Sequence, residues 1–404
     1  MIDYSSILKL FKPNERIFIP GSSAEPRSLV EAISQQAPNL PPLDITNTFL
    51  PVINSVPLVA FDNQLSELVF FPRGGELFET DRVRYRRGSW LGAYSELEKL
   101  KFDWVIVQVS MPDGKGDCSL GTAIEFLPLV LKNTKHVLGI INQQMPRLKN
   151  APQINIDCFD TSIEIDEPLV TYTTADADEV SKAIANHLMS LIDDDAVLQI
   201  GLGNVPEQLV RSLKDRQNLR FHSGMLSNGF IELFDAGALD PDFEHSCTLT
   251  LGSNQFYQRL ADIDNLSLVS VEKSHALMIP DKGNSFHAIN SALQVDLSGR
   301  ANLEFIGSKR VSNVGGALDF ARRADYEKNG KNIIALPATA SGGQVSRIVS
   351  CLDRAEHNSL AGNCPDFVVT EFGVADLRGA SRLEKANSLI AIAAPNFQSQ
   401  LALT

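Results

Sequence analysis

The feature that most constrains this chain is a pattern that occurs twice. Residues 17–33 and 197–213 each begin with an apolar stretch, which a glycine, a proline and a Leu-Val pair follow at the same spacing. The matching residues are Gly21 and Gly201, Pro26 and Pro206, and Leu29-Val30 and Leu209-Val210. An apolar strand, a glycine turn and a helix that starts near a proline form the first part of an open α/β domain. The repeat therefore predicts two related α/β halves.

Further apolar segments indicate how each half continues. Their residue types favour strands, and helical patterns separate them. The expected strands are 104–109 and 136–141 in the first half, and 266–271, 292–295, 303–306, 332–336 and 367–369 in the second. Strands that recur among helices favour an α/β class with parallel pairing. At 404 residues the chain also exceeds the ~250–300 residues of one core, so we expect domains at 1–170 and 171–404.

The composition excludes several classes of protein. A net charge of −13 argues against nucleic acid as a partner, because phosphate binding needs a basic face. No run of ~18 apolar residues is present, so no membrane span is expected. The start of the chain lacks the basic residues and apolar core of a signal peptide, which predicts a cytoplasmic protein. The five cysteines are scattered and form no CxxC pair, so we expect reduced thiols and no metal site.

One basic cluster stands out against the acidic background. Arg82, Arg84, Arg86 and Arg87 lie close together in the sequence and end beside Trp90. They are either a solvated loop or an arginine-rich lip for the phosphates of a large anionic cofactor.

Glycine turns in the second half are candidate anion sites. In Gly201-Leu-Gly-Asn-Val-Pro206, an apolar strand precedes the turn and a helix is expected from about Glu207, so backbone N–H groups face one spot. The turn residues Gly201, Gly203 and Asn204 are therefore candidate cofactor-binding residues. Two further loops contain paired glycines, Gly315 with Gly316 and Gly342 with Gly343, and Arg347 follows the second pair. The second half therefore has three donor-rich loops, which suits the binding of a thioester or a nucleotide tail.

Several short motifs, in this order and spacing, resemble a known family. They are Gly21-Ser-Ser-Ala-Glu-Pro26, Gln108-Val-Ser-Met-Pro-Asp-Gly-Lys-Gly116, Cys118-Ser-Leu-Gly121, Asn142-Gln-Gln-Met-Pro146, Gly201-Leu-Gly-Asn-Val-Pro206, Ile289-Asn-Ser-Ala-Leu293, Ser346-Arg-Ile-Val349 and Val369-Thr-Glu-Phe-Gly-Val-Ala-Asp-Leu-Arg-Gly379. The chain resembles the acetyl-CoA hydrolase/transferase family of class I CoA transferases over nearly its whole length. The resemblance implies two similar open α/β domains of the CoA-transferase type with the active site between them. It also implies a homodimer.

The resemblance further implies a ping-pong reaction on an acyl-CoA and a small carboxylic acid. In the family a glutamate attacks the thioester and becomes acylated, and it then carries CoA before passing it to the second acid. Backbone amides stabilise the oxyanion. By resemblance, these amides belong to Val205, Gly315 and Gly316.

The sequence departs from the family at the nucleophile. The family pattern is His-Thr-Glu-Met-x-Ser-Asp-Gly, and this chain has His222-Ser-Gly-Met-Leu-Ser-Asn-Gly229. Gly224 occupies the position of the glutamate and has no side chain to acylate. Gln294 and Ala317 also replace residues that are usual in the family.

Three hypotheses follow from this departure. In the first, the protein remains an acyl-CoA enzyme, and a water activated by Glu25 or His222 replaces the carboxylate, so that hydrolysis replaces transfer. In the second, it is an acyl-CoA-binding pseudoenzyme or a non-catalytic partner of an active paralogue. In the third, it is a sugar-phosphate or nucleotide-binding α/β protein with only a fold-level likeness.

Overall fold

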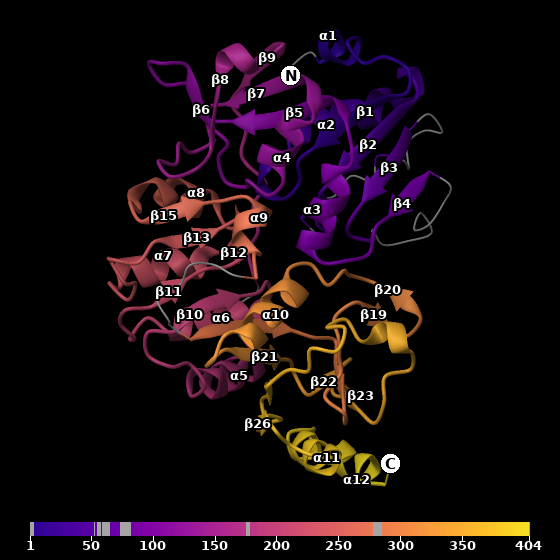
Figure 1. The fold of residues 1–404 in the computed structure, drawn as a ribbon, viewed down its shortest axis with the longest axis vertical. Coiled ribbons are helices and arrows are strands. Elements are labelled where there is room, and N and C mark those ends of the chain that lie inside the picture. The colour runs from indigo at the N-terminus through magenta and orange to yellow at the C-terminus, as the bar shows by residue number, and fades with distance from the viewer. Residues whose placement is uncertain are drawn as a thin grey trace. The chain divides into compact units, whose positions relative to one another are not determined.

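The structure is a computed structural model that describes residues 4–51, 53–54, 58, 65–72, 82–174, 178–277 and 285–403 (Figure 1). The chain divides into two compact units. Unit 1 contains Met1–Tyr172 and Thr248–Glu272, and unit 2 contains Thr173–Cys247 and Lys273–Thr404. The predicted second domain includes residues 248–272, but in the structure this segment packs in unit 1. Hydrogen bonds hold it there, because the Ile124 amide donates to the Thr248 carbonyl and the Ser23 hydroxyl donates to the Thr250 carbonyl.

The sheet of unit 1 is parallel throughout its seven strands, in the order β4-β3-β2-β1-β5-β7-β9. The strands are β1 Glu15–Ile19, β2 Leu43–Asn47, β3 Leu65–Val69, β4 Val83–Tyr85, β5 Phe102–Val109, β7 Thr134–Asn142 and β9 Thr161–Ile165. The predicted strands 104–109 and 136–141 are confirmed as parts of β5 and β7.

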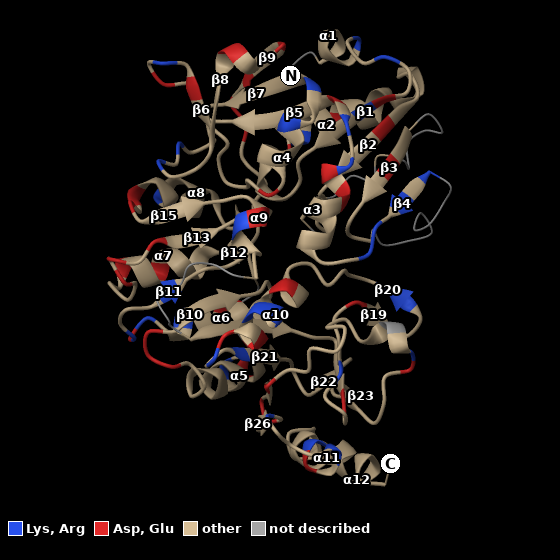
Figure 2. Ribbon diagram, in the orientation of Figure 1, with Lys and Arg blue, Asp and Glu red and all other residues tan. Residues whose placement is uncertain are grey.

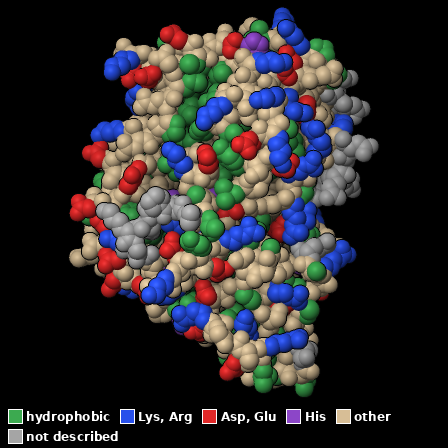
Figure 3. All heavy atoms as spheres, viewed as in Figure 1, with side chains coloured by type: hydrophobic (Ala, Val, Ile, Leu, Met, Phe, Trp, Pro, Cys, Tyr) green, Lys and Arg blue, Asp and Glu red, His purple; other side chains and the backbone are tan. Residues whose placement is uncertain are grey.

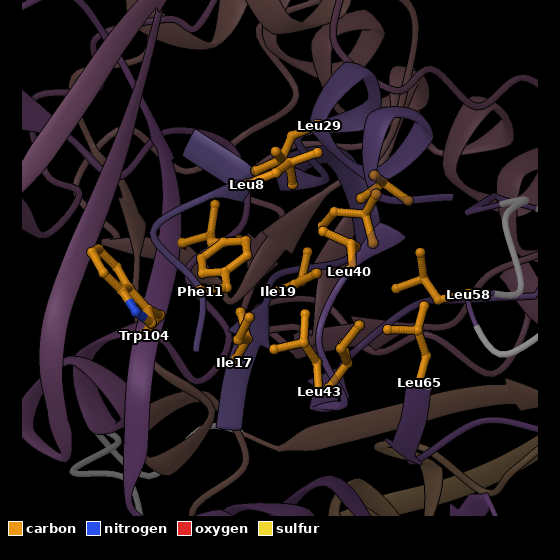
Figure 4. Close-up of a cluster of buried hydrophobic side chains, with 14 of the residues drawn as sticks. Leu8, Phe11, Ile17, Ile19, Leu29, Leu40, Leu43, Leu58, Leu65 and Trp104 are labelled. Carbon is orange, nitrogen blue, oxygen red and sulfur yellow. The ribbon is translucent and has the colours of Figure 1, made fainter. Parts of the chain in front are cut away.

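The core of unit 1 forms where helix α2, Arg27–Gln36, covers the sheet (Figure 4). Ile17 and Ile19 of β1 are fully buried in it with Leu29 of α2. These positions are apolar at strand and helix spacing in the sequence, and each such side chain contributes ~1.5–3 kcal/mol on burial. The first repeat is therefore built as a strand, a glycine turn and a helix, as predicted.

The sheet of unit 2 has the order β11-β10-β16-β21-β25-β26 and is parallel except for the antiparallel pair β25 and β26. Its strands are β10 Val197–Ile200, β11 Arg220–Phe221, β16 Phe286–Ser291, β21 Lys331–Ala335, β25 Phe367–Thr370 and β26 Gly373–Asp376. In both sheets the first strand along the chain lies inside the sheet, between the second strand and a later one: β1 lies between β2 and β5, and β10 lies between β11 and β16. The prediction of two similar open α/β units is confirmed at the level of topology.

The other helices and the short strands complete the two units. The helices are α1 Ser5–Leu8, α3 Trp90–Glu98, α4 Leu127–Lys132, α5 Glu179–Met189, α6 Asn204–Ser212, α7 Asn228–Asp235, α8 Asn254–Arg259, α9 Val271–Ser274, α10 Ala317–Tyr326, α11 Arg382–Ala391 and α12 Pro395–Leu401. The short strands are β6 Asp117–Ser119, β8 Gln153–Asn155, β12 Met225–Leu226, β13 His245–Cys247, β14 Leu249–Thr250, β15 Leu266–Leu268, β17 Gln294–Asp296, β18 Ala301–Asn302, β19 Phe305–Ile306, β20 Lys309–Arg310, β22 Thr339–Ala340, β23 Val345–Ser346 and β24 Ile348–Val349.

Three predicted strands are only partly correct. The segment 266–271 is a strand only as far as Leu268, and helix α9 begins at Val271. The segments 292–295 and 303–306 contribute only to the short strands β17 and β19. Short apolar runs do not distinguish a central strand from a short one outside the sheet.

The charged residues do not form a uniform basic surface. Lys and Arg lie among Asp and Glu on the face drawn in Figure 3. The arginine cluster spans β4 (Figure 2). At least two of its members have acidic partners. Arg84 pairs with Asp44 of β2, and the Arg86 Nε atom lies 3.9 Å from a carboxylate oxygen of Glu96 of α3. In the described part of the chain, no helix combines the length and the apolar character that crossing a bilayer requires.

Candidate active site

The turn after β10 exposes backbone donors at the start of a helix. Helix α6 begins at Asn204, three residues before the predicted Glu207, and Gly203 precedes it with a φ of 134° that L side chains rarely adopt. The Gly201 amide donates to the Ile289 carbonyl of β16, so this predicted donor is used by the sheet. Within the described residues, none accepts a hydrogen bond from the Val205 amide. That amide is therefore free to bind an anion.

The segment from His222 to Gly224 extends the line of β11 beside the end of β10. The His222 amide donates to the Leu198 carbonyl, and the Ser223 amide donates to the Ser246 carbonyl. The Ser223 hydroxyl also donates to the Ile200 carbonyl over 3.3 Å. These bonds place Gly224 at the carboxyl end of the parallel strands, which is where open α/β sheets bind ligands.

Both ring nitrogens of His222 are hydrogen-bonded. Its Nε2 atom donates to the Ser274 carbonyl over 2.7 Å, so its Nδ1 atom accepts from the Ser246 hydroxyl over 2.6 Å. Burial, together with the positive charge of Arg323, lowers the pKa of His222 to about 3. The ring is neutral, and neither nitrogen is free to take a proton from water. This arrangement does not favour the predicted role of His222 as a base.

His275 fills the space beside Gly224, which the sequence prediction missed. A Cβ atom built on Gly224 would lie 3.3 Å from the Nε2 atom of His275 and 3.2 Å from the Phe320 ring. A Cβ atom on Gly316 would lie only 2.5 Å from the same Nε2 atom. The imidazole packs on Phe320 with ring centroids 4.5 Å apart. His275 therefore brings together two predicted site glycines, Gly224 and Gly316.

The paired glycines lead into helix α10. Gly315 has a φ of 55°, in the left-handed region, and Gly316 is the residue before the first helical residue. No described residue accepts a hydrogen bond from the amide of Gly315 or of Gly316. With the Val205 amide, unit 2 thus has free amides at the start of two helices. Their assignment as oxyanion donors stays a prediction.

Glu207 is a second residue that the sequence analysis missed. It is 5% exposed, and its carboxylate accepts hydrogen bonds from the Gly229 amide, over 3.0 Å, and from the Ser227 hydroxyl. Arg211 lies 3.5 Å from it. The carboxylate anchors the start of α7 to α6, and these partners occupy it fully. It is therefore held as a structural group and not as a free nucleophile.

The other predicted cofactor residues lie in a different part of unit 2. Gly342 and Gly343 form the exposed turn between β22 and β23, where an added Cβ atom would meet nothing within 4 Å. Arg347 donates to the Ala292 carbonyl over 3.4 Å, and burial lowers its pKa. Among the described residues, these three do not contact the cluster around Gly224. Their role in binding a cofactor stays a prediction.

Glu25 lies in unit 1 and is 2% exposed. Asn54 donates to its carboxylate over 2.9 Å, and Gln108 donates to its backbone carbonyl over 3.2 Å. A second buried acid, Glu125, accepts from the hydroxyls of Ser22 and Thr48. Burial raises the pKa of Glu125 to about 7, because those hydrogen bonds only partly offset the effect of burial. The role of Glu25 as a base stays a prediction.

A small apolar pocket lies beside the glycine turn of unit 2. It has a volume of about 10 Å³, and its lining includes Gly201, Pro206, Phe221, Met225 and Phe230. A cavity of this size holds no more than about one water molecule. In the described ranges, no three His, Cys, Asp or Glu residues are grouped as metal ligands.

Comparisons with known proteins agree with this architecture. The fold is that of the CoA transferases. A crystal structure of a 4-hydroxybutyrate CoA-transferase from Porphyromonas gingivalis has 25% identity and a TM-score of 0.82, and the match covers 99% of this chain and 95% of that one.

Sequence relatives identify the family. The 4-hydroxybutyrate coenzyme A transferase of Clostridium kluyveri is 36% identical over 310 residues, which cover 75% of this chain and 72% of that protein. The acetyl-CoA hydrolase of Neurospora crassa is 26% identical over 372 residues, which cover 80% of this chain and 67% of that protein. The model of the acetyl-CoA hydrolase/transferase C-terminal domain matches residues 252–404. The chain belongs to the acetyl-CoA hydrolase/transferase family.

Proposed function

We propose that this protein binds a small acyl-CoA and hydrolyses its thioester. The observation that carries the proposal is the cluster in which His275 and Phe320 contact both Gly224 and Gly316, the residue before α10. The Val205 amide at the start of α6 is a further candidate donor in the same unit. The family relationship supplies the substrate class, because the relatives are CoA transferases and acetyl-CoA hydrolases.

Hydrolysis needs no carboxylate on the protein. The oxygen of a water attacks the thioester carbon, the C–S bond breaks, and the CoA thiolate leaves and takes up the proton that the water loses. The amides of Val205 and Gly316 would stabilise the negative charge on the carbonyl oxygen. Each such donor contributes about 2.7–4 kcal/mol to transition-state stabilisation in known cases.

Transfer by a covalent glutamate is disfavoured at this position. Gly224 has no side chain, and Glu207, the buried acid in the preceding helix, is held by the Gly229 amide, Ser227 and Arg211. Binding without catalysis is the remaining alternative.

The test separates these activities. The protein is incubated with acetyl-CoA and a short carboxylic acid, and free thiol and acyl exchange are followed separately. We expect free thiol without exchange. Exchange at a useful rate would support transfer, and CoA binding with neither product would support the non-catalytic alternative. The homodimer and the cytoplasmic location stay predictions, and the mass in solution tests the first.

A further inference from the structure

We propose that His275 is a catalytic residue whose Nε2 atom donates a hydrogen bond to the carbonyl oxygen of the bound thioester. The proposal rests on the acyl-CoA function proposed above, and it names the group that takes the space next to the missing glutamate.

The position of His275 is the first argument. Its Nε2 atom lies against Gly224, the nucleophile position of the family, and against Gly316, whose amide is a candidate oxyanion donor. Both contacts exist only because these residues have no side chain. A carbonyl oxygen that binds the Gly316 amide would therefore lie close to Nε2.

The unpaired nitrogen is the second argument. His275 is 1% exposed, and its Nε2 atom has no hydrogen-bond partner among the described residues. An unpaired buried polar atom costs ~1–3 kcal/mol, so such an atom in a folded protein calls for an explanation. Packing against Phe320 would be served equally well by an apolar side chain. A ligand that supplies the missing partner accounts for a histidine here.

The neighbours of the ring determine which atom carries the proton. The Nδ1 atom lies 2.8 Å from the Ser274 hydroxyl, which can donate to it and leave the proton on Nε2. Ser274 is itself held, since its carbonyl accepts from His222. Burial and the neighbouring His222 lower the pKa of His275 to about 3, so the ring stays neutral. A neutral imidazole is known to polarise a substrate carbonyl as a hydrogen-bond donor.

Two substitutions separate this role from packing and from base or nucleophilic catalysis. His275→Gln keeps an N–H donor but offers no imidazole base, and His275→Leu keeps similar volume without a donor. With acetyl-CoA, we expect kcat for thiol release to fall ~10²-fold or more in His275→Leu and to stay within ~10-fold of the native value in His275→Gln. KM should change little in either variant. Native activity in His275→Leu, or an equal loss in both variants, would overturn the proposal.

A spectroscopic measurement on the unmodified protein does not depend on the variants folding. In protein labelled with ¹⁵N-histidine, we expect His275 at neutral pH to be the tautomer protonated on Nε2. Its Nε2 proton should shift downfield when an acetyl-CoA analogue with a methylene in place of the sulfur binds. A proton on Nδ1, or an unchanged resonance in the saturated complex, would overturn the proposal. Calorimetry with the same analogue distinguishes failure of the His275 proposal from failure of the proposed function. Absence of binding would refute the acyl-CoA function itself.

Discussion

The Nε2 atom of His275 lies 2.5 Å from the point where a side chain on Gly316 would place its Cβ atom. The backbone of Gly316 has a φ of −79°, which any residue adopts, so only steric contact prevents a side chain there. We expect Gly316→Ala to displace the imidazole and to lower the free energy of unfolding by ~1–3 kcal/mol. Urea unfolding measures this. Gly114→Ala is the control, because nothing lies within 4 Å of its added Cβ atom. Equal losses in the two variants would contradict the contact.

Restoring the family glutamate should not by itself restore transfer. A Cβ atom on Gly224 would lie 3.3 Å from the Nε2 atom of His275 and 3.2 Å from Phe320, closer than ordinary contact. Because a misplacement of ~1 Å can reduce a rate ~10²-fold, we expect Gly224→Glu alone to give ~10²-fold less acyl exchange than Gly224→Glu combined with His275→Gln, which removes the rigid ring but keeps an N–H donor. His275→Gln alone is the control and should give none. Full exchange in the single variant would show that the imidazole is not an obstacle.

The buried carboxylate of Glu207 should contribute more to stability than the exposed carboxylate of Glu232, although both lie near Arg211. Glu207→Ala leaves the Gly229 amide without its acceptor at the start of α7, and we expect a loss of ~1.5–3 kcal/mol. Glu232 lies 3.3 Å from the same Arg211 but is 49% exposed, so Glu232→Ala should cost below ~1 kcal/mol. Urea midpoints compare the two. A larger loss in Glu232→Ala would contradict this role of Glu207.

Buried histidines should make the protein less stable in mild acid. Burial lowers the pKa of His222 and His275 to about 3 and that of His245 and His287 to about 4. Because an unfolded histidine titrates near ~6.5, the unfolded chain binds protons below that pH that the native state does not. The contribution of these neutral histidines to the free energy of unfolding is complete above pH ~6.5. Below that pH it decreases by up to ~1.4 kcal/mol per pH unit for each histidine.

Glu125 acts in the opposite direction. Burial raises its pKa to about 7, so its contribution is present below ~4.5 and is lost as the pH rises through about 7. Its effect on the pH dependence of stability cancels that of about one of the four histidines. We expect the urea concentration at the unfolding midpoint to decrease as the pH is lowered from neutral to ~5. In His275→Gln, the dependence of the unfolding free energy on pH should be smaller by about one proton. An unchanged slope in His275→Gln would mean that His275 is charged in the native state.

Much of the fold could be predicted because the local signals agree with the tertiary structure. The repeated strand, glycine turn and helix appear as β1 with α2 and β10 with α6. The start of α6 was misplaced by three residues, because Pro206 marks the first turn of a helix but not its first residue. Residues 248–272 pack with unit 1, which a pattern along the chain does not report, because it rests on hydrogen bonds such as that between Ser23 and Thr250.

The site could be predicted only in part. The turn at Gly203 and the absence of a carboxylate at Gly224 are visible in the sequence. The role of His275 is not, because it lies far along the chain in the sequence Glu-Lys-Ser-His and carries no motif. The resemblance implies that Gly224 stands where the family has a glutamate, but only the packing shows that His275 and Phe320 lie beside it. The pairing of His222 with Ser274 and Ser246 is likewise visible only in three dimensions.

In the function that we propose, backbone amides stabilise a thioester oxyanion and the protein forms no covalent acyl intermediate. Single-turnover cleavage of acetyl-CoA in heavy-oxygen water, followed by mass spectrometry of the protein and of the released acid, tests it most directly. We expect heavy oxygen in the released acetate and a protein of unchanged mass. An acyl group, CoA or heavy oxygen found on a protein carboxylate would contradict it.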